Sequence, residues 1–258
     1  MWSLKILQSK RFSVRVPILF AGILTLILLS CNPAPEELNI GAAPVVMKVL
    51  DEVAKDFKGC KVNITYAPSG QIAQQVRQGA PLDLLILADK DYIETLAKEG
   101  FILEGSIKIY ARTSLVVWVP EGEPRIESFE ELASIPGKIA IANPDYSPYG
   151  QAAGKALKTS GLWGKIKEKI VYAEGVHHAL QLAETKNASA ALVPLPLVLE
   201  LKGHYILVPK EFYTPPEQSL AIVKGTKHEV CARKFIAYLL GPENKRVFEK
   251  YGFEVPED

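Results

Sequence analysis

The stretch Leu84-Leu85-Ile86-Leu87-Ala88-Asp89 gives the clearest indication of the fold. Five apolar residues in a row are typical of a short parallel strand that is buried on both faces. Aspartate is favoured at helix N-termini, so Asp89 predicts a helix that runs to Lys98. A buried strand that leads directly into a helix is the repeating unit of α/β proteins.

The same unit of strand, small-residue turn and amphipathic helix recurs on both sides of this stretch. We predict strands at 38–41, 62–66, 84–88, 138–142, 169–173 and 190–193. We predict helices that begin at Pro44, after Ser69, at Asp89, after Gly150 and at Val176, and two more at 228–239 and 242–251. Such alternation implies α/β sheets with right-handed crossovers.

Two extended segments, 114–119 and 217–223, separate the strand–helix halves of the chain. Two crossings between two α/β halves indicate two lobes that are joined by a hinge, with a cleft between them. The length agrees with this organisation, since 258 residues, at about 150 residues per domain, allow one large domain or two modest lobes.

The composition is that of a soluble globular protein, with 48% hydrophobic and 23% charged residues. It excludes a disordered chain, a collagen and a polytopic membrane protein. Thirty basic and 29 acidic residues give a net charge of +1, which argues against strong non-specific binding to nucleic acids. Three cysteines are too few for a disulfide scaffold.

Residues 1–30 differ from the rest of the chain, because they contain four basic residues and no acidic one. A basic segment followed by the fourteen-residue apolar run 16–29 predicts a secretory signal. The run is short of the about twenty residues that span a membrane. Its end, Leu28-Leu29-Ser30-Cys31, resembles a bacterial lipobox, which implies acylation of Cys31 and removal of the signal. An uncleaved N-terminal anchor is the alternative, and both place the body of the protein outside the cytoplasmic membrane.

Removal of residues 1–30 leaves 26 basic and 29 acidic residues, a net charge of −3. Residues 31–37 are polar and rich in proline, so we interpret them as a tether. The remaining cysteines, Cys60 and Cys231, then lie in a compartment that permits disulfides. The sequence is compatible with a bridge between them and equally with two buried thiols.

Motifs of catalysis are missing from the sequence. It contains no G-x-S-x-G, S-x-x-K, Walker A or G-x-G-x-x-G pattern, and its four histidines show no metal-binding spacing. The adjacent His177 and His178 are expected at a partly exposed helix start. We therefore expect a protein that is not an enzyme, with no catalytic residue, no cofactor and no metal-ion ligand.

The turns that follow the predicted strands are made of small residues, and each opens a helix. They read Gly41-Ala42-Ala43, Ala67-Pro68-Ser69-Gly70, Ser147-Pro148-Tyr149-Gly150 and Glu174-Gly175-Val176. In α/β sheets such turns gather at the carboxyl ends of the strands, beside the ligand crevice. Helix N-termini present free N–H groups and a partial positive charge, so several of them predict an anion site without Lys or Arg. The alternative is that Ser69 and Gly150 act only as helix caps and turn formers.

From residue 38 to 256 the chain resembles the molybdate-binding proteins, which are the substrate-capturing subunits of bacterial ABC importers. The resemblance is carried by Ser69–Gln75, Gly79–Asp89, Gly161-Leu162-Trp163, Glu174-Gly175-Val176 with Ala179-Leu180, and Phe248-x-x-Tyr251-Gly252-Phe253. It implies a type II periplasmic-binding-protein fold with two α/β lobes, two hinge strands and an inter-lobe cleft. Lobe 1 is then expected at 38–116 and 217–258, and lobe 2 at 117–216.

The resemblance also implies a site in which serine hydroxyls and main-chain N–H groups hold a tetrahedral oxyanion. Ser69 matches a serine that binds through its hydroxyl and N–H, with Gly70 beside it, and Tyr149 and Val176 match main-chain donors. Two positions depart from the family pattern. Pro44 stands where the family has a serine ligand, so we expect Ala43 or a water to replace the lost donors. A hydroxyl of Tyr146 or Tyr149 is a further candidate to compensate for the donors lost at Pro44. Pro194 stands where some relatives have a tyrosine.

These observations predict a lipid-anchored extracytoplasmic receptor that binds molybdate or tungstate and delivers it to a membrane permease. We expect it to act as a monomer, to close by hinge motion and to bind no nucleic acid. One alternative keeps the fold and changes the ligand to sulfate, phosphate or a small organic anion. Another is a lipoprotein enzyme or scaffold whose cleft is degenerate.

Overall fold

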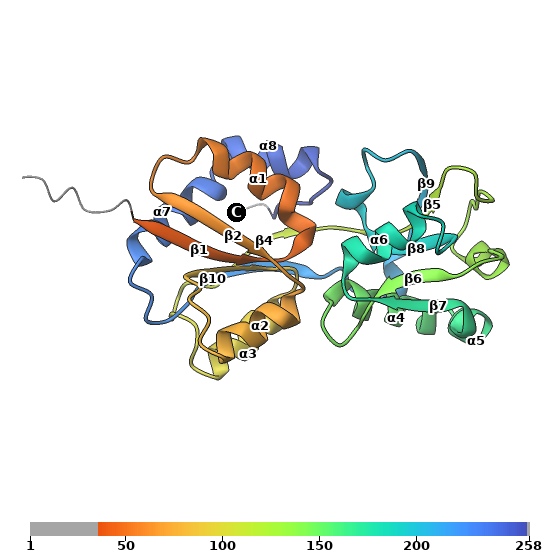
Figure 1. The fold of residues 1–258 in the computed structure, drawn as a ribbon, viewed down its shortest axis with the longest axis horizontal. Coiled ribbons are helices and arrows are strands. Elements are labelled where there is room, and N and C mark those ends of the chain that lie inside the picture. Colours follow the sequence, from red (N-terminus) through yellow and green to blue (C-terminus); the bar gives the residue numbers. More distant parts are fainter. Residues whose placement is uncertain (1–35, 257–258) are drawn as a thin grey trace, which may run out of the picture. The chain divides into compact units, whose positions relative to one another are not determined.

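The computed structural model describes residues 36–256 (Figure 1). The predicted signal, the lipidation site Cys31 and all but the last two residues of the predicted tether lie outside this range. The described residues form two five-stranded sheets, each covered by helices. None of the helices formed by residues 36–256 combines the length and the apolar composition of a membrane span.

The sheet of lobe 1 has the strand order β2-β1-β3-β10-β4. Its strands are β1 (Glu37–Ala42), β2 (Lys61–Tyr66), β3 (Leu84–Leu87), β4 (Lys108–Arg112) and β10 (Glu217–Ile222). β1 runs parallel to β2 and β3, whereas β10 runs antiparallel to β3 and β4. The apolar stretch 84–88 is therefore a buried central strand, as predicted, with one parallel and one antiparallel neighbour.

Helices cover both faces of this sheet because the side chains of β3 alternate between two apolar clusters. Leu84 and Ile86 belong to the large cluster that includes residues of α1 (Met47–Asp56), α7 (Glu229–Leu239) and α8 (Pro242–Lys250). Leu85 and Leu87 belong to a second cluster, with residues of α2 (Ser69–Arg77) and α3 (Lys90–Lys98). A strand with apolar side chains on both faces is stable only when both are covered.

The sheet of lobe 2 repeats this plan with the strand order β7-β6-β8-β5-β9. Its strands are β5 (Leu115–Pro120), β6 (Ile139–Ala142), β7 (Ile170–Ala173), β8 (Ala190–Pro194) and β9 (Gly203–Leu207). β6 is parallel to β7 and β8, and β5 is antiparallel to β8 and β9. The helices are α4 (Pro148–Thr159), α5 (Trp163–Ile166) and α6 (Val176–Glu184).

Short 3-10 helices complete the secondary structure of the described residues. They are η3 (Pro44–Val46), η4 (Glu130–Ser134), η5 (Lys167–Lys169), η6 (Leu195–Leu197) and η7 (Lys210–Phe212). η3 runs directly into α1, with Pro44 as its first residue. The predicted helix start at Pro44 is therefore confirmed, and the first turn is wound as a 3-10 helix.

The strands β4 and β9 were not expected from the sequence. Both lie at an edge of their sheet, and their side chains are largely exposed or half-buried. An edge strand of this kind needs no apolar run, so the sequence pattern that reveals β3 is missing from it.

The chain crosses from lobe 1 to lobe 2 between β4 and β5, at Thr113 and Ser114. The expected boundary lay two residues later, and Leu115 and Val116 were assigned to lobe 1. Both residues instead pair with strands of the second sheet, Leu115 with Pro194 and Val116 with Val193. The extended segment predicted at 114–119 is thus a full member of lobe 2, and we place the crossing before it.

Cys60 and Cys231 form a disulfide. Of the two alternatives that the sequence left open, a bridge or two buried thiols, the structure has the bridge. Their Cα atoms are 6.2 Å apart, within the usual range for a bridge. The bond ties the turn between α1 and β2 to the terminal helix α7, so both ends of lobe 1's sequence are linked covalently.

Candidate functional site

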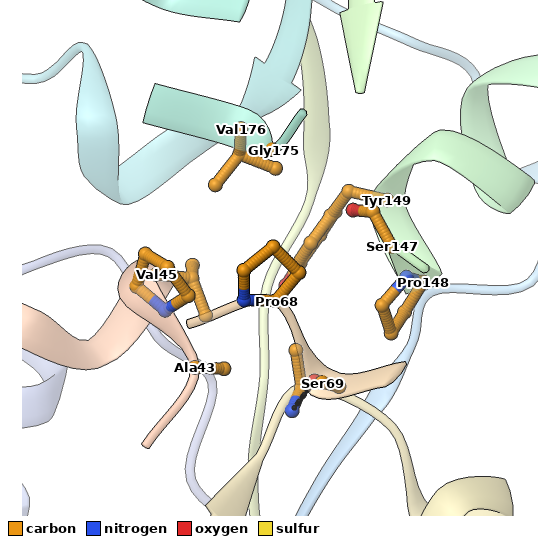
Figure 2. A pocket seen from close by; sticks show the side chains of 11 residues that line it. Ala43, Val45, Pro68, Ser69, Ser147, Pro148, Tyr149, Gly175 and Val176 are labelled. Carbon is orange, nitrogen blue, oxygen red and sulfur yellow. Dashed lines mark hydrogen bonds between the residues drawn. The ribbon is translucent and has the colours of Figure 1, made fainter. Parts of the chain in front are cut away.

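One small cavity lies where the four helix-opening turns meet (Figure 2). Two turns come from lobe 1, at the starts of η3 and α2, and two come from lobe 2, at the starts of α4 and α6. The cavity is small, with a volume of about 20 Å³. Its lining residues are Ala43, Pro44, Val45, Pro68, Ser69, Ala88, Ser147, Pro148, Tyr149, Gly175 and Val176.

Five of the six positions that the resemblance places at the ligand line this cavity, namely Ala43, Pro44, Ser69, Tyr149 and Val176. They are distant in sequence, and the fold brings them together from both lobes. The sixth, Gly70, is not among the lining residues. Its N–H donates to the Tyr146 carbonyl at 3.0 Å, and a Cβ atom on Gly70 would lie only 3.0 Å from the Tyr146 Cα. Gly70 therefore serves the close approach of α2 to the 143–147 loop of lobe 2.

Main-chain N–H groups are the principal donors of the cavity. The N–H groups of Val45, Ser69, Tyr149 and Val176 find no acceptor among residues 36–256. Each lies in the first turn of its helix, where no preceding turn offers a carbonyl. Together they point the positive ends of several helices at one place, which favours a negatively charged ligand.

Ala43 does not supply the donor that we expected in place of the serine missing at Pro44. Its N–H donates to the Ile86 carbonyl at 2.8 Å and is used within the sheet. The free N–H of this turn belongs to Val45, one residue beyond Pro44. Val45 was not predicted, because the resemblance identifies only the position of the missing serine, Pro44. The signal was available, since the second residue of any helix has a free N–H.

Ser69 is buried, with 1% of its surface exposed, and its hydroxyl is held in place. The Ser69 Oγ accepts a hydrogen bond from the Ala88 N–H at 3.1 Å, while its own proton has no acceptor within residues 36–256. Ser69 is the first residue of α2 and its side chain makes no capping bond to the helix. The interpretation of Ser69 as a mere helix cap is therefore wrong.

The cap of α4 is Ser147, whose Oγ accepts from the Gly150 N–H at 3.4 Å. Gly150 itself is needed for packing, since a Cβ atom there would lie 2.3 Å from the Ala142 carbonyl oxygen. Ser147 also lines the cavity; the sequence placed it in a turn beside the ligand crevice, but no role was predicted for its side chain. A serine directly before a proline at a helix start is a recognisable capping pattern and offered a signal for it.

The side chain of Tyr149 belongs to a buried network. Its hydroxyl oxygen accepts from Gln218 Nε2 at 2.6 Å, and the Tyr110 hydroxyl donates to Gln218 Oε1 at 3.2 Å. Burial holds the pKa of Tyr149 well above the usual tyrosine range. Of the two hydroxyls considered for compensation, the one of Tyr149 lies in a cavity residue, whereas Tyr146 is 46% exposed and is not a lining residue.

None of the eleven lining residues carries a charge. Any attraction of the cavity for an anion therefore has to come from the helix N-termini, as predicted from the turns. Across the described part of the chain, no group of three or more His, Cys, Asp or Glu residues is arranged to hold a metal ion.

Three hydrogen bonds around the cavity join the lobes. The first is the Gly70–Tyr146 bond, the second joins Gln218 of β10 to Tyr149 of α4, and the third joins His177 Nε2 to the Pro44 carbonyl at 3.2 Å. His177 is an exposed residue of α6. The cavity is therefore closed by contacts that exist only while the two lobes lie together.

Two α/β lobes of matching strand order, with a small cavity of N–H donors between them, define a class of ligand-capturing binding proteins. The chain belongs to the family of bacterial extracellular solute-binding proteins, whose sequence model matches residues 38–254.

Individual relatives agree with this membership. YvgL of Bacillus subtilis (strain 168), named as a substrate-binding lipoprotein of an ABC transporter, is 34% identical over 223 residues, covering 84% of this chain and 85% of YvgL. The molybdate-binding protein ModA of Azotobacter vinelandii is 30% identical over 234 residues, covering 88% of this chain and 93% of ModA.

The solved structure of the periplasmic molybdate-binding protein of Azotobacter vinelandii is similar to this chain with a TM-score of 0.80 and 28% identity. The similarity covers 85% of this chain and all of that one. The two-lobed periplasmic-binding-protein fold predicted from the sequence is thereby confirmed.

Proposed function

We propose that this protein captures molybdate or tungstate outside the cytoplasmic membrane and delivers it to the permease of an ABC importer. The observation that carries the proposal is the convergence of four free main-chain N–H groups and the Ser69 hydroxyl on one small, uncharged cavity. A donor-rich site without charged side chains suits a compact dianion, which the helix N-termini attract.

The number of donors is sufficient for useful affinity. A hydrogen bond to a charged group contributes about 1.5–3 kcal/mol net, and a micromolar Kd requires about 8 kcal/mol. Five such bonds contribute about 7.5–15 kcal/mol in total, and the upper part of this range covers the association cost and still leaves about 8 kcal/mol. Because all five donors come from one chain, we propose that the protein acts as a monomer.

The chemistry of the cavity favours an oxyanion that carries no proton. The Ser69, Ser147 and Tyr149 hydroxyl oxygens each accept one hydrogen bond from the protein, and the lining residues include no carboxylate or imidazole that would accept a further O–H. Hydrogen phosphate would bring an O–H group that needs an acceptor, and an unpaired buried donor is costly. Molybdate, tungstate and sulfate are free of this penalty. The names of the molybdate-binding relatives support the larger ions.

The same cavity supports binding rather than turnover. Its lining residues include hydroxyls but no His, Asp, Glu, Lys or Cys that could act as a base beside them. Activation of a serine for catalysis requires such a neighbour. We therefore propose a binding protein that releases its ligand unchanged.

We further propose that Cys31 carries a lipid anchor and that residues 32–37 tether the lobes to the membrane surface. The proposal rests on the sequence Leu28-Leu29-Ser30-Cys31 after a basic and apolar segment, and YvgL, named a lipoprotein, supports it. Mass spectrometry of the protein purified from a bacterial membrane tests it. We expect an N-terminal diacylated Cys31. A protein that still begins with Met1 would contradict the lipid anchor at Cys31.

Isothermal titration calorimetry of the full chain in mild detergent tests the ligand. The titrants are the sodium salts of molybdate, tungstate, sulfate and phosphate. We expect one site per chain, with molybdate and tungstate in the micromolar range or tighter and phosphate at least tenfold weaker. Heat from none of the four anions would contradict the proposed function, and tighter binding of sulfate than of molybdate would reassign the ligand.

A further inference from the structure

A buried chain of three polar side chains connects the sheet of lobe 1 to Tyr149, which lines the cavity. Tyr110 lies on β4, Gln218 on the return strand β10 and Tyr149 at the start of α4. All three are at most 2% exposed. Tyr110 and Gln218 do not line the cavity. Tyr149 does, and the proposed function uses only its main-chain N–H group.

The direction of the hydrogen bonds leaves one proton unused. Tyr110 donates to Gln218 Oε1 at 3.2 Å, so the amide presents its Nε2 to Tyr149 and donates to the Tyr149 oxygen at 2.6 Å. The Tyr149 hydroxyl proton then finds no acceptor among residues 36–256. Burial keeps this hydroxyl protonated, because it raises the pKa of Tyr149 well above the usual tyrosine range.

The residue that bears this unused proton lines the cavity. In Figure 2 the ring of Tyr149 extends from α4 toward the middle of the group, behind Pro68. A buried O–H without an acceptor is costly, and a bound anion would supply the acceptor.

We propose that the Tyr149 hydroxyl donates a hydrogen bond to the bound oxyanion, and that Gln218 is the positioning residue that turns this hydroxyl toward the ligand. This inference rests on the proposed function and deepens it. Tyr149 then contributes two donors, its main-chain N–H and its hydroxyl, from a single residue at the start of α4.

The same arrangement couples ligand binding to closure. Gln218 belongs to the sheet of lobe 1 and Tyr149 to lobe 2, so the Gln218–Tyr149 bond forms only while the lobes lie together. In the open state the hydroxyl loses its orientation. The closed state therefore binds the anion with one more fixed donor, and a ligand that prefers this state shifts the population toward it.

The test is calorimetric titration of the full chain in mild detergent with sodium molybdate and sodium tungstate. Tyr149→Phe removes only the hydroxyl, and we expect about a tenfold to hundredfold loss of affinity for both anions. The matched control is Tyr66→Phe, which removes another tyrosine hydroxyl, one that donates to Asp51 Oδ1 at 2.7 Å and lies outside the cavity. We expect unchanged affinity for this control, and thermal unfolding verifies that each variant is folded.

A double-mutant cycle tests the role of Gln218. Gln218→Met removes the orienting amide, and we expect about a threefold to tenfold loss of affinity that disappears when Tyr149 is already phenylalanine. In Gln218→Glu the carboxylate accepts the Tyr149 proton and turns it away from the ligand, so we expect a larger loss. An effect of Gln218→Met that persists undiminished in the Tyr149→Phe background would indicate a merely structural role and overturn the positioning.

The outcomes for the inference and for the proposed function are distinct. If the unaltered protein gives no heat with either anion, the proposed function fails and the inference fails with it. If the unaltered protein binds and a folded Tyr149→Phe variant binds equally tightly, the inference is overturned and the proposed function stands.

Discussion

The Ser69 hydroxyl oxygen accepts a hydrogen bond from the Ala88 N–H at 3.1 Å, which fixes the start of α2 against the end of β3. The bond occupies the oxygen of Ser69 and leaves its proton for the cavity. One residue thus serves both the packing of lobe 1 and the proposed ligand.

Ser69→Ala should therefore lower both affinity and stability. The loss of a donor to a charged ligand predicts about a tenfold to hundredfold weaker Kd for molybdate. The Ala88 N–H is left buried without an acceptor, which predicts a loss of about 1–3 kcal/mol in the free energy of unfolding. Calorimetric titration and urea unfolding measure the two effects.

The control for Ser69 is Ser106→Ala. Ser106 is also buried, and its Oγ accepts from the Ile222 N–H at 3.1 Å, but it does not line the cavity. We expect a similar loss of stability with unchanged affinity. Equal affinity in the two variants would contradict the role of Ser69 in binding.

Gly70→Ala tests the approach of the lobes. The added Cβ would meet the Tyr146 Cα at 3.0 Å and its carbonyl oxygen at 3.2 Å, so the Gly70–Tyr146 hydrogen bond has to lengthen. We expect weaker molybdate binding, because the donors of the two lobes no longer converge. Gly154→Ala is the control, since its Cβ would meet nothing within 4 Å. It should leave affinity unchanged and raise stability by up to about 1 kcal/mol.

The disulfide should stabilise lobe 1 without touching the ligand site. Replacing Cys60 and Cys231 together by serine should lower the free energy of unfolding by about 2–5 kcal/mol. Neither cysteine lines the cavity, so the Kd for molybdate should not change. A reductant should reproduce the loss in the unaltered protein and have no effect on the double variant. Equal stability of the two proteins would contradict the bridge.

Glu217 predicts a specific acid dependence of stability. Hydrogen bonds from Lys90, at 2.8 Å, and then from Arg112 hold the pKa of Glu217 below its usual value. A lowered folded-state pKa stabilises the protein above the unfolded value of about 4.3, and this contribution disappears as the pH falls through the folded-state pKa.

Glu217→Gln should accordingly destabilise the protein at neutral pH, by about 0.2–1 kcal/mol because the partners are partly exposed. The difference from the unaltered protein should vanish in strongly acidic solution. Urea unfolding at a series of pH values measures it. A difference that stays constant down to the most acidic sample would contradict the ion pairs as its cause.

The sequence predicted those features that depend on short stretches of chain. The apolar run 84–88 and the cap at Asp89 are local patterns, and the structure has both. The four helix-opening turns are equally local, so their meeting at one cavity followed from the α/β plan. The resemblance to known binding proteins then selected Ser69, Tyr149 and Val176 within these turns.

The features that were missed depend on distant partners. Gln218 bonds to Tyr149, 69 residues away, and only the fold reveals that contact. The position of this glutamine in a predicted extended segment was at most a weak signal. The N–H of Ala43 is consumed by Ile86, and the carbonyl that receives Gly70 belongs to Tyr146. Which main-chain groups stay free is decided by such pairings, and composition and periodicity do not contain them.

The most direct test of the central claim is a crystal structure of the protein grown with sodium tungstate, with X-ray data collected at the tungsten absorption edge. We expect one dominant anomalous peak in the cavity, with oxygens within hydrogen-bond distance of the N–H groups of Ser69, Tyr149 and Val176. A dominant peak elsewhere, with this cavity empty, would contradict the assignment of the oxyanion site.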